Sequence, residues 1–434
     1  MSEKIAVIGS GISGVSAAYF LSSKFDVHLF EKKSRLGGHT RTIFIEDDNN
    51  LAIDTGFIVF NNKNYPDLIK FFNLLDVKYE NSDMSFAVSN LISKIEYSGK
   101  NFLTLFASFK NVFSYKYIKM IFEIYKLYKL CNSFDLENNQ NNITISEFLD
   151  TYNFSNYVRK FHIYPLISSI WSSNNNNVKN FPFVSFVNFF KNHGLFNLSN
   201  RPQWKYVLGG SKTYIDKIIN LNLFKCSTNF SITHIYRKNS KIEIIDMNKK
   251  KYQFDKIVLA THADEALALI SDATHEETDI LSKFIYSKNT AILHSDQKLM
   301  PNKKNIWSSW NFIVKSKKNN DFTLTYWMNN LQNLKTKKNY FVTINPPFQP
   351  STIKDITTFE HPIFNLSTLQ AQKELYKIQG KQNTFFCGSY FGYGFHEDGI
   401  QSSALVAKLL GLNLPWTRDK NFINRLQFNV NNEV

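Results

Sequence analysis

The apolar positions near the start of the chain form short runs that predict a strand, a helix and a second strand. Residues 5–8 read Ile-Ala-Val-Ile without interruption, and residues 26–30 read Asp-Val-His-Leu-Phe. Between these two runs, residues 13–24 have the apolar spacing of a helix. Two strands joined by a helix are the repeating unit of a doubly wound parallel sheet, so we expect an α/β fold.

The turn between the first strand and the helix carries three glycines, Gly9, Gly11 and Gly14. Glycines at this spacing let backbone N–H groups approach a pyrophosphate, and the N-terminus of the helix adds partial positive charge. Glu31 ends the second strand, 20 residues after Gly11, where a carboxylate can accept from both ribose hydroxyls. The motif predicts a dinucleotide site, and the alternative is an ordinary tight turn between a strand and a helix.

Later segments predict further elements. Alternating patterns separated by a polar turn predict two strands at 230–236 and 241–246, and an apolar run predicts a buried strand at 256–260. Weaker patterns predict a helix at 214–221 and strands at 290–294, 322–327 and 340–344. The Asn-rich stretches at 137–142 and 174–177 are interpreted as loops.

A second glycine pair, Gly37-Gly38, follows Glu31 closely, with Arg35 just before it as a fixed positive fork. This stretch resembles the E-x(3)-R-x-G-G segment of flavin amine oxidases and their relatives. Residues 54–57 (Asp-Thr-Gly-Phe) resemble the D-x-G element that follows it in that family. Near the other end of the chain, residues 386–390 and 394–399 are similar to the family's last FAD segment, in which a strand ends and a helix begins beneath the isoalloxazine ring. The resemblance implies FAD as the cofactor.

The resemblance assigns FAD contacts to residues spread along the whole chain. They are Gly9, Gly11, Ser13, Gly14, Glu31, Lys32, Arg35, Gly38, His39, Thr40, Thr55, Gly56, Phe57, Ile232, Gly388, Asp398, Gly399 and Ile400. The last helix is expected to begin near 399–401 and to aim N–H donors at the N1/O2 edge of the flavin. Asp398 has an alternative role as the cap of that helix. His39 stands where many family members have arginine.

Because the cofactor motifs lie near both ends of the chain, the resemblance implies a discontinuous Rossmann-like FAD-binding domain with an inserted α+β substrate domain, as in amine-oxidase-like proteins. The pieces of the FAD-binding domain are expected at 1–85, 201–265 and 375–434. The substrate domain is expected at 86–200, mostly helical, and at 266–374, with mixed strands and helices.

Four phrases narrow the resemblance to a bacterial subgroup whose members are described as predicted NAD/FAD-binding or amine-oxidase-like proteins. They lie at 54–61, 201–204, 260–264 and 394–399. The subgroup is similar to the flavoprotein domain at the N-terminus of plant cyclopropane fatty acid synthases, which implies a connection to lipid metabolism. We therefore expect an FAD-dependent oxidoreductase that oxidises or desaturates a hydrophobic, fatty-acyl substrate by hydride transfer to flavin N5. Two alternatives are an amine or amino-acid oxidase and a non-catalytic, flavin-bearing partner of a lipid methyltransferase.

His396 and Tyr393 are the candidate catalytic residues, because the resemblance brings their segment near the flavin ring. His396 either hydrogen-bonds the flavin or a substrate, relays a proton, or only caps the following helix. Tyr393, together with Tyr390, forms an aromatic wall beside the ring or packs in the core. Cys387 is interpreted as a small buried residue rather than a flavin tether. Arg201 is interpreted as structural, with a substrate contact as the alternative.

Composition and charge limit which partners, metal sites and cellular locations we expect. The chain has 434 residues with a formal charge of +15, but lysine dominates over arginine and no nucleic-acid-binding motif occurs, so nucleic acid is not an expected partner. The positive charge suits contact with an anionic membrane. Three cysteines without a C-x-x-C pair, and no H-E-x-x-H motif, indicate a reducing compartment and no metal site. With a first strand near residue 4 and no long apolar run, we expect a cytoplasmic protein that contacts the inner membrane face.

Residues 102–130 are rich in Phe, Tyr, Ile and Leu, with five interspersed lysines. Their apolar residues follow a helical period through 106, 109, 113, 117, 121, 124 and 128. Such a segment can lie on a membrane surface with its lysines toward phosphate headgroups. The alternative is an amphipathic helix of the substrate domain.

Overall fold

The predicted first strand, β1 (Lys4–Ile8), lies at the centre of a five-stranded parallel sheet. The computed structural model describes residues 2–135, 142–197, 201–238, 240–315, 323–419 and 422–427. The sheet has the order β10 (Lys225–Ser227), β2 (Asp26–Phe30), β1, β14 (Lys256–Leu259) and β20 (Thr384–Phe386). It therefore takes strands from the beginning, the middle and the end of the chain, and the α/β class is confirmed.

Both faces of β1 are buried, because the side chains of a strand alternate between the two sides of its sheet. Ile5 and Val7 pack into one core, and Ala6 and Ile8 pack into another. The first core lies under α1 (Ile12–Leu21), α2 (Pro66–Leu74), α11 (Lys212–Asn220) and α16 (His396–Leu409). The second is covered by α12 (Ala263–Leu269), α13 (His275–Leu281), α15 (Leu366–Glu374) and the antiparallel strands β11 (Ile232–Lys238), β12 (Lys241–Asp246) and β13 (Lys251–Phe254).

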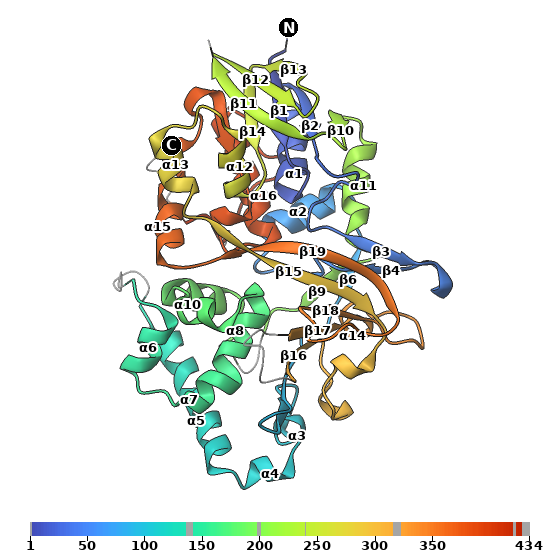
Figure 1. Ribbon diagram of the computed structural model, residues 1–434, viewed down its shortest axis with the longest axis vertical. Helices are drawn as coiled ribbons and strands as arrows, with labels where there is room; N and C mark the ends of the chain where they lie inside the picture. Colours follow the sequence, from blue (N-terminus) through green and yellow to red (C-terminus); the bar gives the residue numbers. More distant parts are fainter. Residues whose placement is uncertain are drawn as a thin grey trace.

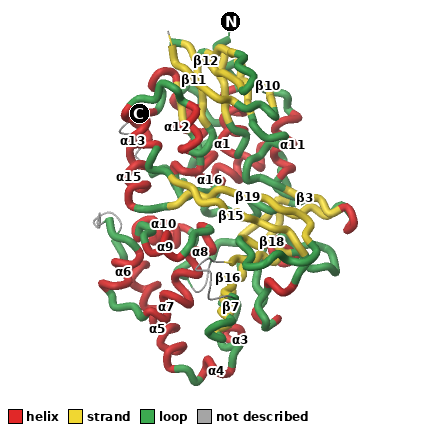
Figure 2. Tube along the Cα trace, in the orientation of Figure 1, coloured by secondary structure: helices red, strands yellow, loops and turns green. Residues whose placement is uncertain are grey.

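A seven-stranded mixed sheet forms the second layer and crosses the middle of the molecule (Figure 2). Its strands, in spatial order, are β19 (Ile353–Ile363), β15 (Ile285–His294), β18 (Phe341–Ile344), β17 (Thr323–Trp327), β16 (Trp310–Val314), β7 (Phe86–Asn90) and β8 (Ile95–Ser98). Only the pair β16–β7 is parallel within the described part of this sheet. This pairing connects the first inserted stretch of the chain to the second.

Helices of the first inserted stretch form a lobe below this sheet (Figure 1). They are α3 (Phe102–Leu105), α4 (Phe109–Val112), α5 (Tyr115–Ser133), α6 (Ile145–Thr151), α7 (Asn156–Val158), α8 (Tyr164–Trp171), α9 (Asn175–Lys179) and α10 (Phe183–Asn192), with a π-helical turn at Arg159–Ile163. Their apolar side chains share one core with the seven-stranded sheet. No helix among the described residues is both long enough and apolar enough to cross a bilayer.

Short elements connect the layers. They are the hairpin β3 (Thr42–Ile45) and β4 (Leu51–Asp54), the small sheet of β5 (Val59–Asn61), β9 (Trp204–Val207) and β6 (Tyr79–Asn81), and helix α14 (Met328–Leu331).

Two sequence predictions in the helical lobe need correction. Residues 102–130 form three successive helices rather than one continuous helical period. The Asn101 side chain caps α3 and the Ser114 side chain caps α5, each accepting from the backbone N–H of the third residue of its helix. The Asn-rich stretch 174–177 is not a loop, because Asn174 caps α9 through the N–H groups of Asn176 and Asn177. Of the other Asn-rich stretch, 137–142, only Asn142 is among the described residues.

Strands β7, β8, β16 and β19 were not predicted, and β11, β15 and β18 begin at residues other than the predicted ones. Strand β15 begins five residues before the predicted 290, because its first half pairs with β19 along Ile285–Asn289. Residue 322, at the predicted start of β17, lies outside the described residues. β8 carries a polar Glu96 on a buried strand, where it accepts from Ser89 Oγ at 2.7 Å, so no simple alternation marks it in the sequence.

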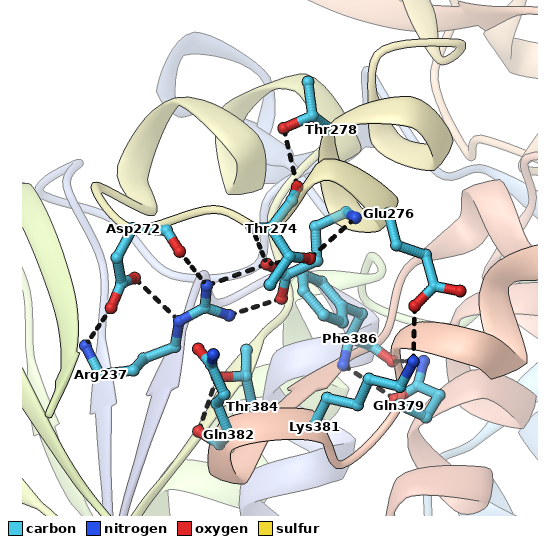
Figure 3. A network of polar contacts seen from close by, with 11 residues as sticks. Arg237, Asp272, Thr274, Glu276, Thr278, Gln379, Lys381, Gln382, Thr384 and Phe386 are labelled. Carbon is cyan, nitrogen blue, oxygen red and sulfur yellow. Dashed lines mark hydrogen bonds and ion pairs between the residues drawn. The ribbon is translucent and has the colours of Figure 1, made fainter. Parts of the chain in front are cut away.

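A buried ion pair joins β11 to α13 behind the parallel sheet (Figure 3). Arg237, whose side chain is only 2% exposed, contacts Asp272 at 2.9 Å and Glu277 at 2.5 Å. Glu277 also caps α13 by accepting from Thr274 N and Oγ1. The buried carboxylate of Glu277 is thus neutralised by the Arg237 guanidinium.

Arg237→Met is expected to destabilise the protein by about 3–5 kcal/mol, because it leaves the Glu277 carboxylate buried without its cation. Urea unfolding of the variant and the wild type measures this difference. Arg237→Met/Glu277→Gln is the matched control and should recover part of the loss. A cost below about 1 kcal/mol for the single variant, as for an exposed pair, would show that the cluster does not hold β11 and α13 together.

Candidate functional site

A long cavity of about 1220 Å³ lies between the parallel sheet and the seven-stranded sheet. One end is lined by the glycine turn after β1 and by Glu31. The other end is lined by aromatic side chains of the inserted stretches, among them Tyr97, Tyr128 and Trp171. Small-molecule pockets commonly have volumes of about 300–1,000 Å³, so this cavity has room for a large cofactor together with a substrate.

The three glycines of the turn have different surroundings. Gly9 has φ +98°, and a Cβ there would lie 2.8 Å from the carbonyl oxygen of Ala260. A Cβ on Gly14 would lie 1.8 Å from the carbonyl oxygen of Gly9, so this glycine lets α1 pack against the strand ends. A Cβ on Gly11 would meet no atom within 4 Å and would point into open space at the cavity. Gly9 and Gly14 are therefore required for close packing of the backbone, whereas the absence of a side chain at Gly11 leaves space in the cavity.

Glu31 is held in one orientation at the end of β2. Its Oε2 accepts from Ser10 N at 3.0 Å and from Ser10 Oγ at 2.6 Å, and its Oε1 accepts from Lys33 N at 2.9 Å. A carboxylate offers about four acceptor positions, so Oε1 keeps capacity for another donor. The side chain is buried in the protein but lines the cavity.

Arg35 fixes the loop that carries Gly38. Its Nη2 donates to the Gly38 carbonyl at 2.8 Å, and its Nη1 donates to the Thr40 carbonyl at 3.3 Å. These two bonds use two of the five N–H groups of a guanidinium, and Arg35 also lines the cavity. A Cβ on Gly38 would lie 3.0 Å from Gly11 Cα, so the two glycine segments approach closely.

His39 belongs to a cluster of three histidines on the cavity wall. Its ring stacks on Phe359 at 4.9 Å, and the rings of His361 and His262 lie 5.6 and 6.3 Å away. Burial lowers the pKa of His39 well below its usual value, and the charges of His361 and His262 would lower it further. Burial lowers the pKa of His361 to about 4. The imidazole of His39 is therefore neutral at physiological pH.

His396 lies on the cavity wall in the first turn of α16. Its ring stacks on Phe57 with centroids 3.7 Å apart, and its Nε2 lies 3.0 Å from Thr40 Oγ1 and 3.3 Å from Tyr214 Oη. Burial lowers its pKa to about 3, so the imidazole is neutral at physiological pH. The side chain does not cap the helix, because Phe395 is the N-cap and its N–H donates to Asp398 Oδ2 at 2.7 Å.

The structure brings most of the predicted cofactor residues to the cavity wall. Those that line it are Gly9, Gly11, Ser13, Glu31, Lys32, Arg35, Gly38, His39, Gly56, Phe57, Ile232 and Gly388. Thr40 and Thr55 lie behind the wall. The side chain of Thr40 is hydrogen-bonded to His396, and that of Thr55 accepts from Arg41. Gly14, Asp398, Gly399 and Ile400 are also buried behind it.

Asp398 and Gly399 have structural surroundings that differ from the prediction. The Asp398 carboxylate is fully buried beside Arg425, 2.8 Å from its Nε, and also accepts from the N-cap N–H. Asp398 is therefore not the N-cap itself; it is the third residue of α16 and accepts from the N–H of the N-cap residue Phe395. Helix α16 begins at His396, three residues before the predicted start, and Gly399 instead allows close packing on α1, because a Cβ there would lie 2.7 Å from Ser13 Oγ.

The other candidates fall in different places. Tyr393 and Tyr390 both line the cavity, and the Tyr393 carbonyl accepts from Trp171 Nε1 at 3.1 Å. Arg201 lines the cavity while donating to the Asn197 carbonyl, so it has both a structural bond and access to the cavity. Cys387 is buried against the backbone of Ser13 and is not part of the cavity wall. Among the described residues, no group of His, Cys, Asp and Glu is arranged to hold a metal ion.

Sequence reasoning missed the residues that the inserted stretches contribute. They include His162, Trp171, Trp310, Tyr326, Phe359 and His361. Nothing local marks them, because aromatic residues are frequent throughout this chain, with 40 Phe and 21 Tyr. The pairing of β16 with β7 and of β15 with β19, together with the packing of α8, brings these side chains to the cavity.

Comparison with known proteins is consistent with this architecture. The family model described as an NAD(P)-binding Rossmann-like domain matches residues 7–75. No match was found among curated protein sequences. Many solved structures match, and the three described next each match nearly the whole chain.

A fatty acid isomerase from P. acnes that produces CLA is 14% identical with a TM-score of 0.67, over 94% of this chain and 98% of that one. A putrescine oxidase bound to putrescine is 12% identical with a TM-score of 0.68, over 94% and 99%. Cyclohexylamine oxidase from Brevibacterium oxydans IH-35A is 14% identical with a TM-score of 0.66, over 95% and 100%. The chain therefore has the amine-oxidase-like fold that its motifs resemble, and it begins with a Rossmann-like domain of the NAD(P)-binding type.

Proposed function

We propose that this chain is an FAD-dependent oxidoreductase that acts on a hydrophobic, fatty-acyl substrate. The observation that carries the proposal is the long cavity, which joins a glycine-lined end typical of dinucleotide sites to an aromatic, apolar end. A cofactor that reaches from one end toward the other would expose its reactive ring to a substrate held among the aromatic side chains.

The residues at the glycine end fit FAD. The open space beside Gly11 suits a pyrophosphate, since no side chain occupies it. The free acceptor capacity of Glu31 suits a ribose hydroxyl, and the unused N–H groups of Arg35 suit a phosphate oxygen. The first turn of α16, with His396 beside Phe57, would lie beneath the ring system.

When bound, FAD supplies a two-electron acceptor that takes a hydride from a substrate carbon. The chain's own part is to orient the substrate and exclude water. Phe57 and His396 give a flat, stacked surface, and the hydrogen bond of His396 to Thr40 holds the neutral imidazole in place. A histidine with a pKa near 3 is almost never protonated to imidazolium at neutral pH, which favours a positioning role for His396 over a proton relay.

The distribution of charge along the cavity supports a hydrophobic substrate. The carboxylates that line it are Glu31, Glu265 and Glu360. Glu265 pairs with Lys32 at the glycine end, and Glu360 lies 3.7 Å from both His262 and Lys288. Among the described residues that line the aromatic end, none offers a carboxylate to a substrate ammonium. An acyl chain suits this end better than an amine, and one neighbour in fold is a fatty acid isomerase.

Of the two alternatives, only the amine oxidase is supported by a comparison. Two neighbours in fold are named for putrescine and cyclohexylamine oxidation, so an amine oxidase is the second candidate enzyme. A flavin-bearing partner of a lipid methyltransferase would bind FAD without turnover.

The test is anaerobic mixing of the purified protein with acyl phospholipids, with putrescine and with cyclohexylamine, while the flavin absorbance is followed. Bleaching by the phospholipids alone supports the proposal. Bleaching by an amine favours the amine oxidase. A flavin that bleaches under light but under none of these compounds favours the accessory role, and a protein that stays colourless after reconstitution with FAD overturns all three.

Gly11→Val is expected to abolish FAD binding while leaving the fold intact. The new side chain would meet no protein atom near its Cβ, but it would fill the space assigned to the pyrophosphate. Released flavin is quantified after denaturation, and circular dichroism reports the fold. Gly99→Val is the matched control, because its Cβ also has no neighbour within 4 Å but lies at the other end of the cavity. Full FAD content in Gly11→Val would refute this placement of the pyrophosphate.

Glu31→Ala is expected to weaken FAD binding by about 1.5–3 kcal/mol through loss of a charged hydrogen bond to ribose. Titration calorimetry with FAD gives the dissociation constant. Because Glu31 also accepts from Ser10 and Lys33, the thermal midpoint is measured in parallel. A lowered thermal midpoint with an unchanged dissociation constant would mean that Glu31 stabilises the glycine turn but does not bind FAD.

His396→Gln is expected to flatten the pH dependence of stability. The folded pKa of His396 is about 3 and its ordinary value is 6.5, so the unfolded chain takes up a proton that the folded chain does not. The stability from the neutral imidazole is complete above pH 6.5 and is lost as the pH falls toward 3. Urea unfolding of the variant and the wild type is measured from about pH 6.5, the ordinary histidine pKa, down to about pH 4.5. The slope of the free energy of unfolding against pH should be smaller in the variant by up to about 1.4 kcal/mol per pH unit. An unchanged slope would mean that His396 is charged in the folded protein.

A further inference from the structure

Apolar side chains are exposed at the end of the helical lobe. Helices α3 and α4 and the first turn of α5 form this end, opposite β12 and β13 (Figure 1). Phe102 is 74% exposed, Leu103 is 80% exposed and Tyr115 is 79% exposed. Monomeric proteins rarely leave several large apolar side chains together in water without a binding role. We call the exposed surface of α3, α4 and α5 the lobe tip.

Helix α5 has two faces of different character. At 100° per residue, its buried positions Tyr117, Met120, Leu127 and Cys131 lie on one side. The opposite side carries Tyr115, Lys119, Phe122, Tyr125, Lys126 and Lys129, all exposed. Phe122 is 69% exposed, although the buried face of the same helix is well packed. The outer face of α5 therefore combines aromatic and lysine side chains.

The lobe tip is strongly basic. Residues 100–133 contain six lysines and a single acidic residue, Glu123. Glu123 is buried and accepts from Ser155 N at 2.9 Å and from Ser155 Oγ at 2.5 Å, so it does not offset the surface charge. A surface that combines exposed aromatic residues with lysines matches the interface of an anionic bilayer, where aromatic rings lie at headgroup level and lysines meet phosphates.

The same charge argues against a second copy of this chain as the occupant. In a twofold contact each copy presents the same patch, so lysines would face lysines without acidic partners. An anionic lipid surface instead supplies the opposite charge and an apolar layer below it.

The aromatic end of the cavity reaches the lobe tip. Gly99, which is exposed and lies three residues before the start of α3, lines the cavity, as does Tyr128 of α5. A membrane in contact with α3–α5 would therefore lie next to an opening of the cavity. For an acyl substrate, which rests on the function proposed above, this gives a direct path from the bilayer.

We propose that the lobe tip is a docking surface for anionic membranes. Phe102, Leu103 and the outer aromatic residues of α5 enter the interfacial layer, and the outer lysines of α5 contact lipid phosphates. The docking needs no bound cofactor, so its test is independent of the redox function.

The test is flotation of the full chain with vesicles of phosphatidylcholine alone or mixed with phosphatidylglycerol. Binding is expected to the mixed vesicles and to fall as salt is raised, because salt screens the lysines. Phe102→Ser/Leu103→Ser should weaken binding about tenfold or more, since two large apolar side chains no longer enter the lipid. Lys119→Gln/Lys129→Gln should weaken binding to mixed vesicles about thirtyfold, at about one kcal/mol per lysine.

Met247→Ser is the matched control, since Met247 is 65% exposed in the turn between β12 and β13, at the opposite end of the molecule. It should bind as the wild type does. Equal binding of the control and the two lobe-tip variants overturns the proposal, as does equal binding to neutral vesicles. Sedimentation without vesicles addresses self-association: a dimer that Phe102→Ser/Leu103→Ser dissociates would assign the patch to a second copy and overturn the lipid assignment.

Discussion

The close packing of α16 on α1 is the constraint on which the rest of the site depends. The two helices touch through small residues, with Ser16 Oγ and Ser403 Oγ only 2.7 Å apart and Gly399 facing Ser13. A larger side chain at Gly399, Ser16 or Ser403 would push the two helices apart. Because the helices lie this close, His396, at the start of α16, reaches Thr40 and Phe57 from the other end of the chain.

Buried carboxylates hold the separate stretches in this arrangement. Glu397 accepts from the first N–H groups of α2, those of Asp67 and Leu68, and so fixes α2 against α16. Asp54 accepts from Thr42, Ser211 and Gln332, which joins three distant segments at one point. Burial raises the pKa of Asp54 to about 6, the usual cost of placing a carboxyl away from water. These groups make the cavity wall rigid without lining it.

The cavity then divides into two chemically different ends. The glycine turn, Glu31 and Arg35 offer hydrogen bonds and positive charge, which suits a dinucleotide. The inserted stretches offer Tyr97, Trp171 and neighbouring aromatic side chains, which suits an apolar substrate. Because exposed Gly99, just before α3, lines the aromatic end, the proposed membrane contact and the proposed acyl substrate agree with each other, although each can fail alone.

The sequence by itself determined the strand–turn–helix at the start of the chain, the position of Glu31 and the α/β class, because glycine sterics and side-chain periodicity act within about thirty residues. It also predicted the paired strands β11 and β12 and the buried strand β14. Only the tertiary structure decided that Asp398 pairs with Arg425, that α16 begins at His396, and that His361 and Trp171 join His39 on one wall. Those contacts join residues far apart in the chain, and they follow from how whole layers pack rather than from any local pattern.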